Sequence, residues 1–169
     1  MAQPVLTLSA IDHGDVERLL ARFGLRLQCV GDGAPIPGSY WGEPEAGIIG
    51  TTIYARADTP VHSLLHEACH VICAPADKRA SIHTDASDCQ FEEDATCYLQ
   101  IILGDALEGV GRARVMQDMD TWGYTFRLGS TCAWFERDAE DARAWLHARS
   151  LLAHPAASAA SLVADDNGH

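Results

Sequence analysis

The segment His66-Glu67-Ala68-Cys69-His70 combines residue types that can hold a metal ion and use it. Its two histidines are four positions apart, so in a helix both imidazoles project from one face, one turn apart. Two neutral ring nitrogens at that spacing can take two corners of a tetrahedral zinc, at about 2.0–2.1 Å each. Glu67 lies beside such a metal without ligating it, where it can take a proton from zinc-bound water and return it to a leaving amine. The segment predicts zinc-dependent hydrolysis, with His66 and His70 as metal ligands and Glu67 as the catalytic base.

A catalytic zinc takes three protein ligands and leaves a fourth position for water, so one more ligand is required. We assign this role to Glu92, near the start of the next expected helix. The small Ala95 would let the two helices approach closely, and Thr96 could orient a ligating histidine. Glu93 remains open as the alternative ligand.

Residues 48–98 resemble the core of the minimal gluzincin metallopeptidases, and particularly of ImmA/IrrE-type proteins. In that family a strand precedes an HExxH helix, and an E-x-x-A segment on the next helix supplies the third zinc ligand. The resemblance implies a peptide or protein substrate, which could pair in extended form with the edge of the strand. The positions that carry it here are His66, Glu67, His70, Glu92 and Ala95.

The elements expected around these residues run helix, two or three strands, then helices only, an α+β order. The motif helix should start with Thr59 as N-cap and Pro60 as its first residue, and end before Pro75. A small antiparallel sheet should pack on a mainly helical body. We expect strands at 25–30 and 48–56, and a third could begin over Ser39 to Trp41. Helices are expected at 12–23, at 61–73, from Asp88 or Cys89 to 104, and at 105–120. One or two more helices should cover 131–152, with Asp138 as an internal cap.

The length of 169 residues fits one domain, expected over residues 1–153, with 154–169 as a flexible Ala/Ser-rich tail. The net charge of −12 argues against partners that present phosphates, such as nucleic acids and acidic membranes. No apolar run approaches the roughly 18 residues that cross a bilayer, and the first residues do not form a signal peptide. A cytoplasmic protein is therefore expected, with no prediction of its oligomeric state.

Other residues near the motif have simpler interpretations. His62 lies one turn before His66 and is a minor candidate for the metal. Most cysteines should be small buried residues, because no C-x-x-C pair is present. The six cysteines are Cys29, Cys69, Cys73, Cys89, Cys97 and Cys132. The aromatic residues expected in the core are Trp122, Trp134, Phe135 and Trp145.

Two questions stay open at this point. His83, Tyr98 and Tyr124 are all eligible to stabilise an oxyanion, although Tyr98 fits the core better. The alternative to an enzyme is a non-catalytic, zinc-stabilised protein-interaction domain, whose metal would be closed by a fourth ligand such as Cys69 or Cys89. A third reading places the motif on a buried helix that binds no metal.

Overall fold

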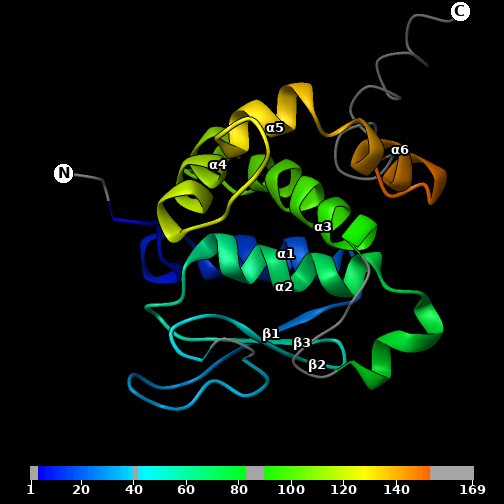
Figure 1. The fold of residues 1–169 in the computed structure, drawn as a ribbon. Helices are drawn as coiled ribbons and strands as arrows, with labels where there is room; N and C mark the ends of the chain where they lie inside the picture. Colours follow the sequence, from blue (N-terminus) through cyan, green and yellow to red (C-terminus); the bar gives the residue numbers. More distant parts are fainter. Residues whose placement is uncertain (1–3, 40–41, 83–89, 153–169) are drawn as a thin grey trace, which may run out of the picture.

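The computed structural model describes residues 4–39, 42–82 and 90–152. These residues form helices and a small sheet in the predicted α+β order, which is confirmed (Figure 1). The sheet makes one layer, α1 and α2 make the next, and α3 to α6 cover them. The elements are α1 His13–Ala21, β1 Arg26–Cys29, β2 Gly47–Ile49, β3 Thr52–Ala55, α2 Val61–Cys73, α3 Gln90–Leu103, α4 Gly111–Trp122, α5 Thr131–Arg137 and α6 Glu140–Ala148.

The sheet is mixed, not purely antiparallel as expected. Its strand order is β1-β3-β2, with β1 parallel and β2 antiparallel to the central β3. The single strand predicted over residues 48–56 is a hairpin, because the chain reverses at Gly50 and Thr51. Gly50 has a φ of 61°, which a hairpin turn of two residues requires and which glycine adopts without strain. The β-branched residues on both sides of Gly50 conceal this turn in the sequence.

The outer edge of β2 is covered by the chain that precedes it. The Ile48 amide donates a hydrogen bond to the Gly38 carbonyl at 3.3 Å. At Gly47 a Cβ atom would lie 1.9 Å from the Pro37 carbonyl oxygen, so only glycine permits this approach. Since β3 lies inside the sheet, the structure does not support the expected pairing of an extended substrate with this strand.

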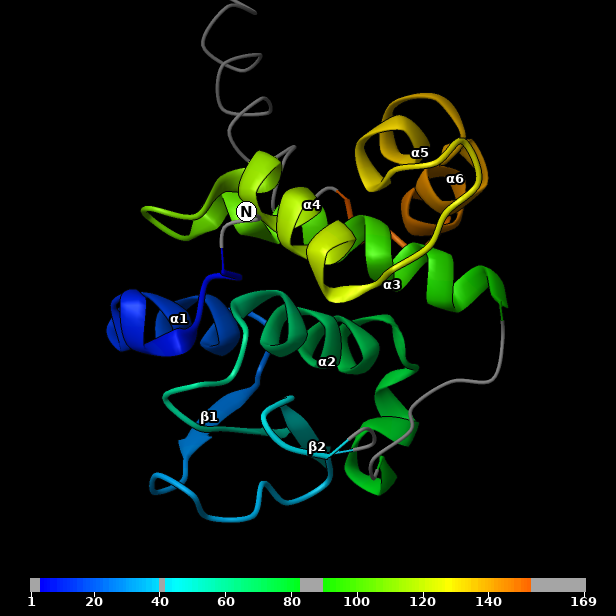
Figure 2. The same cartoon turned by 60° about the vertical axis from the view of Figure 1, so that its left-hand side comes forward.

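Helix α2 has the predicted bounds and lies between the sheet and the upper helices (Figures 1 and 2). Its N-cap is Pro60, one residue later than predicted, because the Thr59 hydroxyl accepts a hydrogen bond from the Arg56 amide instead. Leu64 and Leu65 are buried, and each contributes about 1.5–3 kcal/mol through its burial. A helix covered on opposite sides is apolar nearly all round. The motif therefore stands on one of the best-anchored elements of the fold.

The later helices differ from expectation mainly at their ends. The predicted start of α3 at Asp88 or Cys89 lies outside the described residues. Helix α4 begins only at Gly111, and the segment expected over 131–152 is two helices. Asp138 ends α5, while Ala139 caps α6.

The buried apolar residues form one continuous core from Leu8 to Leu152. The expected tail over 154–169 lies outside the described residues. None of the helices in the described part of the chain is both long enough and apolar enough to cross a bilayer.

Candidate metal centre

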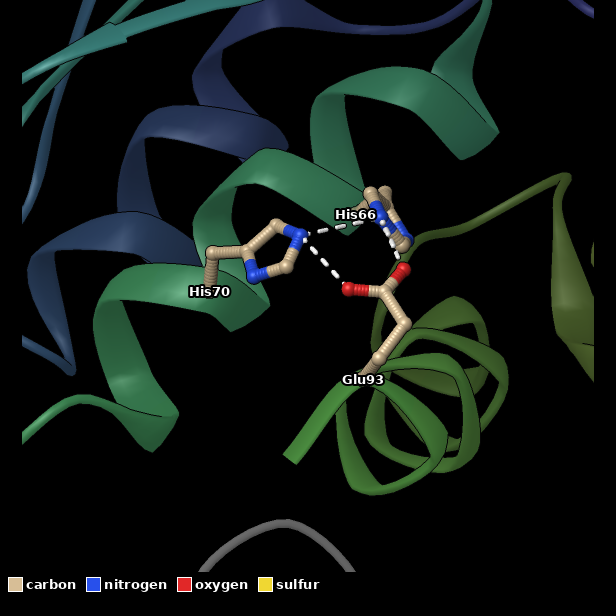
Figure 3. A group of neighbouring side chains, drawn as sticks. All are labelled: His66, His70 and Glu93. Atoms are coloured by element: carbon tan, nitrogen blue, oxygen red, sulfur yellow. Dashed lines mark hydrogen bonds and ion pairs between the residues drawn. The ribbon is translucent and has the colours of Figure 1, made fainter. Parts of the chain in front are cut away.

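Helices α2 and α3 lie against each other and bring two imidazoles and one carboxylate to a common point (Figure 3). The Nε2 atoms of His66 and His70 are 3.1 Å apart. One carboxylate oxygen of Glu93 lies 3.1 Å from His66 Nε2, and the other lies 3.2 Å from His70 Nε2. Among the described residues, this is the group of ligand-type side chains whose donor atoms could hold a metal ion.

The separations within this group fit a small tetrahedral cation. Two donors that bind one zinc at about 2.0–2.1 Å with tetrahedral angles are about 3.3–3.4 Å apart. The two nitrogens, 3.1 Å apart, need only a slight expansion to reach that value, and each carboxylate oxygen of Glu93 lies at a similar distance, 3.1 or 3.2 Å, from one of them. Two nitrogens and a carboxylate are also a donor set that zinc accepts in catalytic sites. The residues present therefore fit a metal ion.

The carboxylate in the group belongs to Glu93 and not to Glu92, to which the sequence analysis gave the ligand role. The reason is the rotation of α3 about its axis. Each residue turns an α-helix by about 100°, so neighbouring side chains cannot share a face. Glu93, Cys97 and Gln100, at spacings of four and three, all lie on the face that meets His66. Ala95 and Thr96 are both fully buried, in keeping with a close approach of the two helices. The Thr96 hydroxyl makes no hydrogen bond to either histidine, so the orienting role expected for Thr96 is not found.

A cleft of about 600 Å³ opens at His66 and Glu93 of this candidate group. One wall is the loop over residues 42–45, and the other is Trp122 at the end of α4 with the segment over 123–126 that follows it. Trp122 donates a hydrogen bond from its indole nitrogen to the Glu45 carboxylate at 2.6 Å, which joins the two walls. Trp122 is therefore a partly exposed cleft residue and not the core residue that was expected. From α2 and α3 the cleft is lined by Ser63, His66, Glu67, Gln90, Glu93, Asp94 and Cys97.

Glu67, the predicted catalytic base, lies next to the group of converging donors. It follows His66 on α2, is largely buried, and lines the same cleft as His66 and Glu93. It is not a member of the group of three converging donors. A carboxylate beside the ligands, inside a partly enclosed cleft, can exchange a proton with a bound water or substrate.

The imidazoles and the Glu93 carboxylate stabilise one another's charged forms and so shift one another's pKa values. Burial acts to lower the pKa of His66, but its polar neighbours, the Glu93 carboxylate among them, outweigh burial and raise it well above 6.5. Burial acts to raise the pKa of Glu93, but the hydrogen bond and charge of the imidazoles lower it. A proton therefore occupies this group at neutral pH when a cation does not.

Of the three residues considered for stabilising an oxyanion, Tyr124 is the one that the structure places at the cleft. Gly123, with a φ of 110°, ends α4 in the left-handed conformation and turns the chain towards the site. Tyr124 then lies with its ring 5.9 Å from the His66 ring, and burial raises its pKa to about 12. Tyr98 is instead buried in the core, stacked on Phe135. His83 lies outside the described residues.

His62 is buried beside the site but does not join the ligand group. Its ring makes edge contacts with Trp122 at 5.4 Å and Tyr124 at 5.5 Å. Neither of its ring nitrogens has a hydrogen-bond partner among the described residues. Burial, followed by the nearby charge of His66, lowers the pKa of His62 to about 3, so this imidazole is neutral. These contacts give His62 a packing role, and it is not among the converging donors, for which it was a minor candidate.

The cysteines divide between core and surface. Cys69, Cys73 and Cys97 are buried, whereas Cys29 and Cys132 are exposed, and Cys89 lies outside the described residues. Burial raises the pKa of Cys69 well above its ordinary value and that of Cys73 to about 12. Cys69 is not among the converging donors, so the described part of the chain does not close the site with this thiol.

Gln100 is a site residue that the sequence analysis missed. Its side-chain oxygen lies 2.9 Å from His66 Nδ1, whereas the other ring nitrogen, Nε2, faces His70 and Glu93. A trace of it is visible in the sequence, because Gln100 is the single uncharged amide in the otherwise apolar run Tyr98-Leu99-Gln100-Ile101-Ile102-Leu103. A buried amide needs partners for its oxygen and nitrogen, which marks such a position for inspection.

Comparison with known proteins does not assign this site, since no family model, no curated protein and no solved structure matches the chain.

Proposed function

We propose that this protein is a zinc-dependent hydrolase, a peptidase of the gluzincin type, with His66, His70 and Glu93 as the metal ligands. The convergence of their donor atoms at 3.1–3.2 Å, beside a cleft that His66 and Glu93 line, is the observation that carries this proposal. The chemistry that zinc supplies in such a site is the acidification of water and the polarisation of a carbonyl group. A cytoplasmic location belongs to the same proposal.

In this proposal the protein's own residues divide the remaining work. The Glu67 carboxylate accepts a proton from the attacking water and passes it to the leaving amine of the peptide. The two cleft walls, joined through Trp122 and Glu45, shield the reacting atoms from bulk water. The phenol of Tyr124 is protonated at neutral pH, so its hydroxyl stands beside His66 as the candidate to stabilise the oxyanion.

The described site fits a catalytic zinc better than a structural zinc that is enclosed by protein ligands. A structural zinc is enclosed by four protein ligands, whereas a catalytic one keeps a position for water. Three donors converge among the described residues, and two of them, His66 and Glu93, line the cleft.

The direct test is elemental analysis of the full chain purified without a histidine tag, followed by assay on a library of quenched fluorescent peptides. About one zinc per chain and chelator-sensitive cleavage support the proposal, and a metal-free protein without activity after zinc addition contradicts it.

Zinc should stabilise the folded protein, because its ligands come from two helices that separate on unfolding. At a free zinc concentration of a hundred times Kd, the gain is about 2.7 kcal/mol. For a chain of this size, that corresponds to a rise in Tm of roughly 5–10 °C. Thermal unfolding with and without zinc measures the shift, with magnesium as the control cation. An unchanged Tm at saturating zinc would contradict the site.

Zinc binding should also release a proton. Because the pKa of His66 is raised, its imidazole is protonated at neutral pH and the metal must displace that proton. Affinity should therefore increase as the pH rises towards the pKa of His66 and level off above it. Calorimetric titrations near pH 7, in buffers of different ionisation enthalpy, should give about one proton released per zinc. A count near zero would contradict the protonated state assigned to the group.

A further inference from the structure

Gln100 reaches from α3 to the back of the His66 ring and to the backbone of α2. Its side chain is completely buried. The oxygen lies 2.9 Å from His66 Nδ1, and the nitrogen lies 2.8 Å from the carbonyl oxygen of His62, one turn earlier on α2. The His66 nitrogen that Gln100 engages is the one that does not face His70 and Glu93. Gln100 thus contacts a ligand of the proposed metal without entering the ligand group.

The direction of each hydrogen bond follows from this arrangement. The His62 carbonyl can only accept, so the atom of Gln100 beside it must be the amide nitrogen. That nitrogen has a second hydrogen, and the Tyr124 hydroxyl lies 3.5 Å away to receive it. The amide oxygen is then turned towards His66, where it can only accept. His66 Nδ1 must therefore carry a hydrogen.

A hydrogen on Nδ1 determines what the other nitrogen of the ring can do. In a neutral imidazole one nitrogen is a donor and the other has a lone pair. With Nδ1 protonated, the lone pair of His66 is on Nε2, which is the nitrogen that faces His70 and Glu93. In the opposite tautomer Nε2 would carry a hydrogen and could not bind a metal ion.

We infer that Gln100 is a positioning residue, whose amide holds His66 in the tautomer and ring orientation that present Nε2 to the metal. This inference rests on the proposed metal site, and it adds a role for a residue outside the ligand set. The two ends of the amide act together, because the His62 carbonyl fixes which end faces the imidazole. Both ends of the amide have hydrogen-bond partners, so its burial leaves neither the oxygen nor the nitrogen unsatisfied.

The test compares Gln100→Met with Thr96→Val in the full chain. Methionine keeps the length of glutamine but removes the amide. Thr96 is buried on the same helix, and its hydroxyl makes no hydrogen bond to His66, so its replacement controls for a general change in packing. Zinc affinity, measured by competition with a fluorescent chelator, should fall ten- to a hundredfold in Gln100→Met and stay unchanged in Thr96→Val. Gln100→Glu keeps an oxygen for the Nδ1 hydrogen but loses the donor to the His62 carbonyl, so it should recover part of the affinity lost in Gln100→Met.

A second measurement needs no metal. Long-range proton–nitrogen NMR spectra of the metal-free protein, at a pH where the imidazole is neutral, distinguish the two tautomers of His66. The unmodified protein and Gln100→Glu should show the Nδ1–H form, and Gln100→Met a mixture. An unchanged tautomer in Gln100→Met, or equal losses of affinity in Gln100→Met and Thr96→Val, would overturn the inference. Failure of the unmodified protein to bind zinc would instead refute the proposed function, while the tautomer comparison would still test Gln100.

Discussion

Replacing Glu67 with glutamine is expected to reduce peptide hydrolysis by about 10²–10⁴-fold, the usual contribution of a general base. Glutamine has nearly the same shape as glutamate but cannot accept the proton of the attacking water. Glu67 follows His66 on α2 and lines the cleft without joining the converging donors, so zinc should remain bound. The measurement is kcat/KM on a peptide cleaved by the unmodified protein, together with the zinc content of both proteins.

The control for this variant is Glu108→Gln, which makes the same chemical change on an exposed residue that does not line the cleft. Its activity should match that of the unmodified protein. Persistent turnover in Glu67→Gln would show that another group is the base. Loss of zinc together with activity would instead assign Glu67 to holding the metal, against the role proposed for it.

Removing the carboxylate of Glu93 should weaken zinc binding more than a hundredfold, whereas removing that of Glu92 should change it only slightly. Replacing a group that only orients a ligand already lowers metal affinity ten- to a hundredfold. Loss of one of the three ligands should therefore lower zinc affinity by more than that. The structure places the Glu93 oxygens 3.1 and 3.2 Å from the two Nε2 atoms. Glu93→Ala and Glu92→Ala are compared by competition with a chelator of known affinity.

These two variants form a matched pair, because they delete the same group from adjacent positions in the first turn of α3. Thermal unfolding of both proteins without zinc separates a loss of fold from a loss of ligand. Equal zinc affinity in the two variants, or a larger loss in Glu92→Ala, would refute the ligand set proposed here. The activity of the two proteins should follow their affinity for zinc.

Part of this site depends only on neighbouring residues, and the sequence predicts that part well. The bounds of α2 agree with those expected, and the helix ends just before Pro75, where a proline removes the next backbone donor. Once this helix exists, the spacing of four places His66 and His70 on one face and Glu67 beside them. Helix geometry repeats every 3.6 residues wherever it occurs, so these relations need no information from the rest of the chain.

Other features of the fold depend on short turns that local composition does not reveal. The run over residues 48–56 has the β-branched composition of one strand, yet Gly50 divides it into β2 and β3. The parallel pairing of β1 with β3 joins segments separated by more than 20 residues, so no periodicity within either strand indicates its direction. The mixed sheet and its covered edge follow from these long-range pairings.

Tertiary structure alone decided which carboxylate joins the two imidazoles. Glu92 and Glu93 stand in the same acidic first turn of α3, and local sequence makes both acceptable there. Which of them meets the imidazoles depends on the rotation of α3 against α2, and that rotation is set by the burial of Ala95, Leu99 and their neighbours in the shared core. One residue of difference turns a side chain by about 100°, enough to move it off the face that meets the imidazoles. Sequence determined that a carboxylate was available, and packing between two helices determined which one arrives.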